Sequence, residues 1–321
     1  MRPALLILAL ALGSVAPESF PQAAIASSGI DAVVYLPDAQ AGYYRGTRFD
    51  WSGAIARLRW KGHEYFGEWF EEHDPLIHDG ITGPVEEFRT GESALGYAEA
   101  NAGESFVRIG VGAVRKPAEP AYRRFATYDI VDPGAWKVTT AADSVTFVQV
   151  LADTNGYAYS YTKTLRLAAD SLVLEHTLKN TGRKPIVTSV YNHNFFTMDR
   201  QPTGPDVVVR FGFDPRSRAD RPLGPLAVLQ GRELHYTRVL EKGQNAATEI
   251  EGFGTSASDY DFRVENRKTR AGVHVTGDRP LSKIVFWSAP KTVCPEPYID
   301  VSAAPGQESS WRITYKFYEV P

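Results

Sequence analysis

The side chains best suited to acid–base chemistry lie in two segments that are far apart in the chain. Residues 189–196 have the sequence Ser-Val-Tyr-Asn-His-Asn-Phe-Phe, in which His193 is surrounded by aromatic and amide side chains. Residues 293–298 have the sequence Val-Cys-Pro-Glu-Pro-Tyr, in which Glu296 stands between two prolines shortly after an apolar run. An imidazole and a carboxylate in distinct environments can act as general acid and general base. We therefore expect these two side chains to move protons to and from a bound substrate.

The motifs of several common enzyme classes are absent from the sequence. There is no Walker-type phosphate loop, no dinucleotide-binding glycine fingerprint and no pair of cysteines for zinc. There is also no Gly-x-Ser-x-Gly nucleophile elbow. Cys294 is the only cysteine, so no internal disulfide can form, and a lone cysteine is more often a small buried residue than a catalytic thiol.

The composition indicates a globular protein with no affinity for nucleic acid. Of the 321 residues, 43% are hydrophobic and 23% are charged, which is enough apolar material for a sizeable core. The formal net charge is -3, with neither a basic excess nor an acidic tract. Aromatic residues make up 12%, which suits a core built from β-sheets or a platform for carbohydrate.

The N-terminus has the pattern of a secretory signal peptide. Arg2 precedes an apolar run over residues 4–12, and Ala24-Ile25-Ala26 forms a small-x-small cleavage pattern before Ser27. The run is shorter than the ~20 residues that a membrane-spanning helix needs. We expect residues 1–26 to be a leader and residues 27–321 to be one exported domain, periplasmic or secreted, with no membrane attachment after cleavage.

The rest of the chain predicts strands joined by turns. Apolar and polar residues alternate over residues 54–60, 144–150 and 311–318. Residues 162–167 lead through Ala169-Asp170-Ser171 into residues 172–178, which is a hairpin pattern. The best helical candidates are short, near residues 68–72 and 85–88. The pattern predicts an all-β protein, a single large antiparallel β-sandwich.

Several of these segments together resemble the galactose mutarotase-like superfamily, which includes aldose 1-epimerases and hexose-6-phosphate mutarotases. The resemblance is carried by residues 170–172, 178–182 and 191–196, by Cys294-Pro295-Glu296-Pro297, and by residues 304–307 before a final aromatic strand. It covers most of the chain after about residue 40. It implies a supersandwich fold.

The resemblance also implies a mechanism of anomer interconversion. His193 would be the general acid that protonates the ring oxygen of a sugar, and Glu296 would be the general base that takes the proton from the anomeric hydroxyl. Such chemistry needs no metal or organic cofactor. Judged from the residues alone, His193 could instead pack half-buried against the phenylalanines that follow it, and Glu296 could be a solvated turn carboxylate. For catalysis, the two side chains should converge on one concave pocket at a distance that admits a pyranose ring.

Four further residues are candidates for substrate binding. Arg48 lies in an aromatic segment, residues 43–51, that suits sugar stacking and hydrogen bonding. His78 is the nearest match to a second histidine that the superfamily places here. Trp287 could form a pocket wall, and Asp206 could bond a hydroxyl, although a turn role is the commoner one. The histidines and carboxylates over residues 73–87 could also bind a divalent cation or form a polar surface loop.

Two other functions remain open at this stage. The protein could be a non-catalytic carbohydrate-binding protein, or a polysaccharide lyase- or hydrolase-associated protein of the same fold, because function depends on the site rather than on the fold. The expected partner is a small-molecule or oligosaccharide ligand. A phosphosugar would require a basic pocket, and export argues against phosphosugars.

Overall fold

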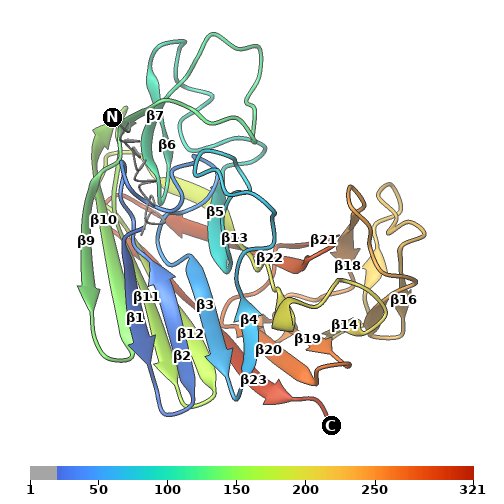
Figure 1. Cartoon of the computed structure of the whole chain (residues 1–321). Coiled ribbons are helices and arrows are strands. Elements are labelled where there is room, and N and C mark those ends of the chain that lie inside the picture. The colour runs from blue at the N-terminus through green and yellow to red at the C-terminus, as the bar shows by residue number, and fades with distance from the viewer. Residues whose placement is uncertain (1–19) are drawn as a thin grey trace, which may run out of the picture.

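The computed structural model describes residues 20–321, and it consists of antiparallel strands connected by turns and loops (Figure 1). The two helical elements are single 3-10 turns, η1 (Met198–Arg200) and η2 (Ala257–Asp259). Within residues 20–321, no helix has the length and apolar character needed to cross a membrane. The all-β sandwich that the sequence predicts is confirmed.

The largest sheet has ten strands and extends across the whole molecule (Figure 1). In spatial order its strands are β16 (Ala227–Gln230), β17 (Glu233–Tyr236), β14 (Val207–Phe211), β19 (Asp261–Asn266), β20 (Ala271–Gly277), β23 (Glu308–Glu319), β12 (Ser171–Asn180), β11 (Tyr157–Ala168), β10 (Ser144–Thr154) and β9 (Ala135–Thr140). The predicted hairpin is β11–β12, and the predicted final strand is β23.

A six-stranded sheet lies against this large sheet. Its strands, in spatial order, are β15 (Arg216–Ser217), β18 (Ala246–Glu251), β21 (Lys283–Ala289), β22 (Thr292–Ala303), β13 (Ile186–His193) and β5 (Val85–Arg89). The helix expected near residues 85–88 is therefore wrong. All five residues of β5 are buried and pair with β13, so tertiary pairing outweighs the local helical preference of the two glutamates. No helix forms over residues 68–72 either.

Two smaller sheets complete the fold. One contains β1 (Gln22–Ala26), β2 (Ile30–Tyr35), β3 (Ile55–Trp60) and β4 (His63–Phe66), and the other contains β6 (Ser105–Arg108), β7 (Gly112–Arg115) and β8 (Ile130–Asp132). Residues 1–19 of the expected leader lie outside the described residues. Its last five residues form β1, in which Ile25 is buried, so the folded domain includes residues that cleavage after Ala26 would remove. Export stays a prediction.

The six-stranded sheet is covered on both faces. On one face, Val190, Phe286 and Ile299 join a core that is shared with the ten-stranded sheet and the four-stranded sheet. On the other face, Tyr191, Val285 and Cys294 join a second core with aromatic side chains from residues 43–51 and from the three-stranded sheet. Strand alternation therefore directs successive side chains of β5, β13 and β22 into two different environments.

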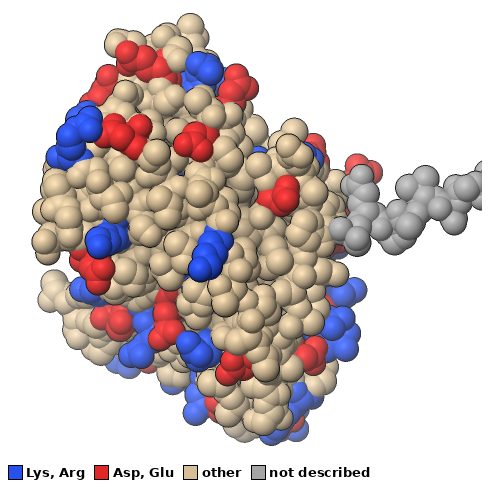
Figure 2. Space-filling model, turned by 90° about the vertical axis from the view of Figure 1, so that its left-hand side faces the viewer, with Lys and Arg blue, Asp and Glu red and all other residues tan. Residues whose placement is uncertain are grey.

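Surface charge is mixed on the side of the molecule that Figure 2 shows. Lys and Arg are interspersed there with Asp and Glu and with large uncharged areas, and no basic stripe of the kind that binds nucleic acid is present on that face.

A buried ionic cluster joins the two main sheets. Lys163 of β11 is fully buried, and its ammonium donates to the Glu86 carboxylate of β5 and, at 2.8 Å, to the Ser52 carbonyl. Asp50 lies 3.8 Å from the same ammonium. The second oxygen of Glu86 contacts His176 Nε2 at 2.8 Å and accepts from Asn192 Nδ2 at 2.9 Å. The cluster fixes β5 in its register against the sandwich interior.

We expect Lys163→Met to destabilise the protein by about 3–5 kcal/mol, because it leaves two buried carboxylates without their cation. Chemical denaturation followed by circular dichroism measures the change. Lys179→Met, an exposed position on β12, is the matched control and should change stability by less than ~0.5 kcal/mol. A loss equal to that of the control would show that the cluster does not stabilise the fold.

Candidate active site

The face of the six-stranded sheet that points away from the ten-stranded sheet carries a row of polar side chains. Glu87, Tyr191, Tyr298 and Lys283 are successive cross-strand partners on β5, β13, β22 and β21. Two residues further along β13 and β22 come His193 and Glu296, and Glu296 is paired with Val285 of β21. The strand period of two therefore presents His193 and Glu296 on the same face as this row.

His193 and Glu296 meet in a cavity of about 300 Å³. Their Nε2 and Oε1 atoms are 3.2 Å apart, and the two residues are 3% and 4% exposed. The expected convergence on one pocket is observed, but the separation is that of a direct contact and leaves no room for a pyranose ring between the two groups. Any substrate has to approach the pair from the cavity.

Burial shifts the protonation of both groups in opposite directions. Desolvation, reinforced by the positive charge of Arg48, lowers the pKa of His193 well below its usual value. Desolvation raises the pKa of Glu296 to about 7, although Arg48 and Arg124 oppose the rise. Just below neutral pH the pair therefore carries one proton, on the carboxyl, beside a neutral imidazole.

Aromatic rings cause much of this desolvation. The Phe195 ring stacks on the His193 imidazole with centroids 3.8 Å apart, and the Phe49 and Trp287 rings contact it edge-on at 5.5 and 5.6 Å. β13 ends at His193, and Phe195 adopts a φ of 42°, which non-glycine residues seldom take. The chain thus turns sharply where the Phe195 ring packs on the imidazole.

Arg48 lies beside the acid–base pair in a fully saturated environment. Its Nε donates to Glu87 Oε2 at 2.9 Å, its Nη2 donates to the Tyr191 hydroxyl at 3.1 Å, and its Nη1 contacts the Asp79 carboxylate. Its guanidinium also lies over the rings of Phe49 and Phe125, at 4.3 and 4.8 Å from their centroids. These contacts hold Arg48 rigidly at the cavity wall.

Glu87 is the anion that organises the arginines. It is 1% exposed and accepts from Arg48 and from Arg124, whose Nη2 lies 2.8 Å from Oε2, while Arg108 is 3.9 Å away. Burial opposes its ionisation, but the neighbouring guanidiniums outweigh burial and hold the pKa of Glu87 well below its usual range. Asp79 behaves similarly: Arg48 overcomes the effect of burial and lowers its pKa to about 2.

Of the four predicted binding residues, two line the cavity and two do not. Arg48 and Trp287 line the cavity. His78 stands behind it, with Nε2 3.1 Å from the Asp79 carboxylate, and Asp79 is the residue that faces the cavity. Asp206 is exposed directly before β14 and does not reach the cavity; its carbonyl accepts from the Arg267 amide.

Several residues of the site were missed by sequence reasoning. Glu87, Arg89, Arg124, Lys283 and Tyr298 all lie at or beneath the cavity. Tyr298 ends the segment 293–298 that contains Glu296, and Lys283 lies close to Trp287 in the sequence. The consecutive glutamates over residues 86–87 favour a helix in isolation, so they gave no signal for Glu87. Arg124 comes from the loop between β7 and β8 and had no sequence signal.

The structure shows no cluster of metal-ligand type in the segment over residues 73–87. Among residues 20–321, no group of three or more His, Cys, Asp or Glu side chains is arranged to hold a metal ion. His73 instead stacks on the Tyr43 ring, with centroids 4.0 Å apart.

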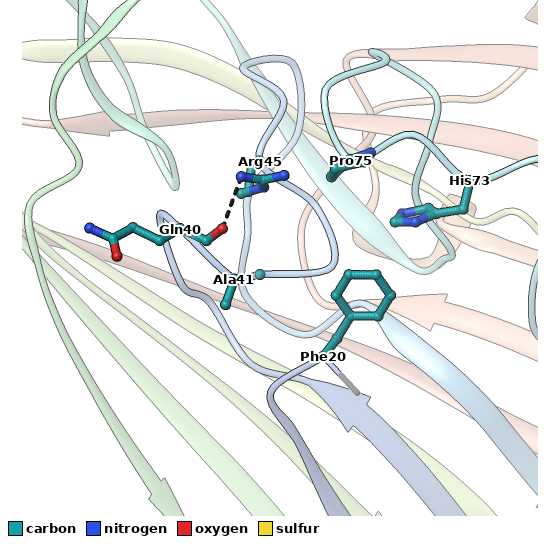
Figure 3. A pocket seen from close by; sticks show the side chains of 7 residues that line it. Phe20, Gln40, Ala41, Arg45, His73 and Pro75 are labelled. Carbon is teal, nitrogen blue, oxygen red and sulfur yellow. Dashed lines mark hydrogen bonds between the residues drawn. The ribbon is translucent and has the colours of Figure 1, made fainter. Parts of the chain in front are cut away.

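A second cavity, of about 380 Å³, lies at the other side of this segment (Figure 3). His73, Phe20 and Pro75 line it, and Arg45 donates to the Gln40 carbonyl at 2.9 Å. Its lining contains one histidine, His73, and no carboxylate. The first cavity is therefore the candidate active site.

Comparisons with known proteins support the fold. No family model and no curated protein sequence matches the chain. Among solved structures, the GalM/aldose epimerase homologue from C. elegans is 15% identical, with a TM-score of 0.57 over 94% of this chain and 100% of that chain. A galactose mutarotase-like protein from Clostridium acetobutylicum is 12% identical (TM-score 0.56; 92% and 95%). A putative aldose 1-epimerase from Escherichia coli K12 is 12% identical (TM-score 0.53; 93% and 99%). The chain has the galactose mutarotase-like fold.

We expect Arg48→Met to raise the pKa of Glu296 above 7, because Arg48 is the largest influence that opposes the rise caused by burial. The carboxyl C=O stretch in a pH-dependent infrared titration, assigned by its loss in Glu296→Gln, measures the shift. Arg48→Lys keeps the charge and should move the pKa less. A fall in the pKa for Arg48→Met would contradict this electrostatic description of the site.

Proposed function

We propose that the protein is an aldose 1-epimerase-like mutarotase that interconverts the anomers of a sugar. The observation that carries the proposal is the buried contact between His193 and Glu296, with the pKa of one lowered and that of the other raised to about 7. Titratable pairs whose environments drive their pKa values in opposite directions are typical of acid–base sites. The shared fold with putative aldose 1-epimerases supports the same assignment.

In the proposed reaction, His193 is the acid and Glu296 is the base. The single proton of the pair moves from the Glu296 carboxyl to His193 Nε2 across their contact, which generates an imidazolium and a carboxylate. Glu296 takes the proton of the anomeric hydroxyl while His193 protonates the ring oxygen, and the bond between C1 and the ring oxygen breaks to give the open-chain aldehyde. Rotation about C1–C2 and reversal of the two proton transfers close the ring with the other configuration. No proton is gained or lost overall.

The short distance between the two groups is compatible with this mechanism. The ring oxygen and the anomeric oxygen are both bonded to C1, so they lie close together at one edge of the sugar. An acid and a base in contact can each turn to one of these oxygens when the sugar replaces their mutual contact. The groups therefore do not need to stand on opposite sides of the ring.

The cavity wall supplies groups suited to the rest of a sugar. The guanidinium of Arg124 uses Nε and Nη2 for Glu87 and Tyr191, which leaves Nη1 without a partner among the described residues. Phe125, 54% exposed, and Trp287 offer apolar surfaces for the C–H faces of the ring. Holding the sugar in a near-reactive position is the second contribution that the site would make.

The rival functions are a carbohydrate-binding protein without turnover and a polysaccharide lyase- or hydrolase-associated protein. Neither requires a buried imidazole in contact with a carboxyl of raised pKa, and this contact is what favours mutarotation. We further propose export on the strength of the leader pattern at the N-terminus, which would place the reaction in the periplasm or the medium.

We expect Glu296→Gln and His193→Asn each to reduce mutarotation by about 10²–10⁴-fold while leaving the fold intact, because each removes one proton-transfer group and keeps its shape. The double variant should lose little more than either single variant, because the two groups act as a unit. Polarimetry on fresh α-anomers of a sugar panel measures the rate above the buffer rate.

Glu251→Gln on the exposed position of β18 and His235→Asn on β17 are matched controls and should keep full activity. Binding of a monosaccharide without acceleration by the wild type would favour the non-catalytic protein. Binding of a polymer alone would favour the polysaccharide-associated role.

We expect kcat/KM for mutarotation to be highest below neutral pH and to fall as the pH rises through about 7. The pair must hold one proton, and above the raised pKa of Glu296 this proton is lost. The acid limb should lie well below 6.5, because the lowered pKa of His193 delays uptake of a second proton. Rates corrected for buffer catalysis between pH 4 and 9 test this. Activity that increases steadily to pH 9 would contradict the one-proton requirement.

A further inference from the structure

The lining of the proposed active site contains more cations than neutral sugars require. Arg48, Arg89, Arg124, Arg221 and Lys283 line it, against the carboxylates Asp79, Glu92 and Glu296. Glu296 is only partly ionised near neutral pH because its pKa is about 7. The lining therefore carries five cationic and three acidic side chains, and Glu87, buried beneath it, is a fourth carboxylate.

Four of these five cations fall into two groups, and the fifth, Arg221, is exposed. Arg48 and Arg124 pair with the buried Glu87, and Arg48 also pairs with the partly exposed Asp79. Arg89 and Lys283 are held less tightly: Arg89 contacts Glu92, whose side chain is 94% exposed, and Lys283 Nζ lies 3.3 Å from Glu249, which also pairs with Arg218 at 2.8 Å. An ion pair with an exposed carboxylate such as Glu92 stabilises little, and Glu249 has a second cation, so an incoming anion can compete for Arg89 and Lys283.

Arg89 has unused hydrogen-bonding capacity. The residue is 8% exposed, and its Nε is buried without a partner among the described residues. A buried guanidinium N–H without an acceptor is unfavourable unless a ligand or water supplies one. Tyr298, whose ring lies 5.6 Å from Lys283 Nζ, likewise makes no hydrogen bond through its hydroxyl within residues 20–321.

The cavity continues beyond the acid–base pair past Tyr298. Beside the active-site cavity lies a second hollow of about 340 Å³, which is not the cavity of Figure 3. It shares Arg89, Glu92, Lys283 and Tyr298 with the active-site cavity. Asp300 lines only this second hollow and is exposed. The two hollows form one groove. Tyr298 on β22 lies between Lys283 on the neighbouring strand β21 and Arg89 on β5 at the edge of the sheet.

We propose that the sugar bound by this site is anionic, and that Arg89, Lys283 and the Tyr298 hydroxyl form a subsite for its carboxylate. The inference rests on the proposed function for the identity of the ligand as a sugar. Guanidinium and ammonium groups beside a hydroxyl donor are the set that binds oxyanions, and hydrogen bonds with a charged partner are about twice as strong as neutral ones. The subsite adds a specificity that the acid–base pair alone lacks.

Direct binding tests the subsite independently of turnover. Calorimetry would compare D-glucose and D-galactose with their uronates, with their 6-phosphates and with digalacturonate. We expect at least one uronate to bind tenfold or more tightly than its neutral parent, with a Kd that rises with salt. The uronate and phosphate arms distinguish the two anions, and digalacturonate tests whether the charge lies on the reacting ring or on the next one. Equal affinity for every neutral and anionic sugar would overturn the proposal.

Variants assign the effect to the subsite. Lys283→Met and Arg89→Met should each weaken binding of the preferred anionic sugar by about tenfold more than they weaken binding of its neutral parent, and Lys283→Glu should increase this difference. Lys291→Met, an exposed lysine outside both hollows, is the matched control. Unchanged binding of the anionic sugar by both Met variants would overturn the assignment.

The two proposals fail in different ways. If the anionic sugar binds selectively but the wild type does not accelerate its anomerisation, the subsite stands and mutarotation is wrong. If neutral sugars are anomerised and anions gain nothing, mutarotation stands and the subsite is wrong. If no sugar binds at millimolar concentration, both proposals are wrong.

Discussion

The structure depends on one constraint, which is that two consecutive carboxylates are buried on a single short strand. On β5, Glu86 points into the sandwich interior and meets Lys163 and His176, while Glu87 points into the candidate site and meets three arginines. Because neighbouring side chains of a strand point to opposite faces, a shift of β5 by one residue would exchange these environments. The buried charges therefore specify the register of β5 against β13, and through β13 the position of His193.

The same constraint explains why a sandwich interior can contain an acid–base pair. Buried charges destabilise a fold unless they are paired. The arginines near the site form their ion pairs with Glu87 and Asp79 rather than with Glu296. The rings of Phe195, Phe49 and Trp287 then exclude water from His193 without supplying charge. The result is a site that is rigid in its surroundings and titratable at its centre.

Sequence reasoning reached the fold and the central pair for identifiable reasons. Period-two alternation in β10–β12 and β23 is a local property, so it predicts strands without knowledge of the sheet order. The short segments around His193 and Glu296 were informative together because the resemblance fixed their order. Arg124 and Arg89 could not be found, because a loop and a distant strand bring them to the cavity only when the chain folds. β5 was misassigned for a related reason: its strand character comes from pairing with β13 rather than from its own residues.

The pKa of Glu296 depends both on the burial of the site and on its neighbouring charges. Burial, the largest influence, raises it, and the guanidiniums of Arg48 and Arg124 lower it. Glu87 and Asp79 offset part of the arginine charge, and both raise the pKa of Glu296 through their own negative charge. These two carboxylates therefore help burial to keep the pKa of Glu296 near neutral. Glu87 in this way acts on the proton-transfer group without touching it, and an arginine-rich site remains compatible with general acid–base chemistry.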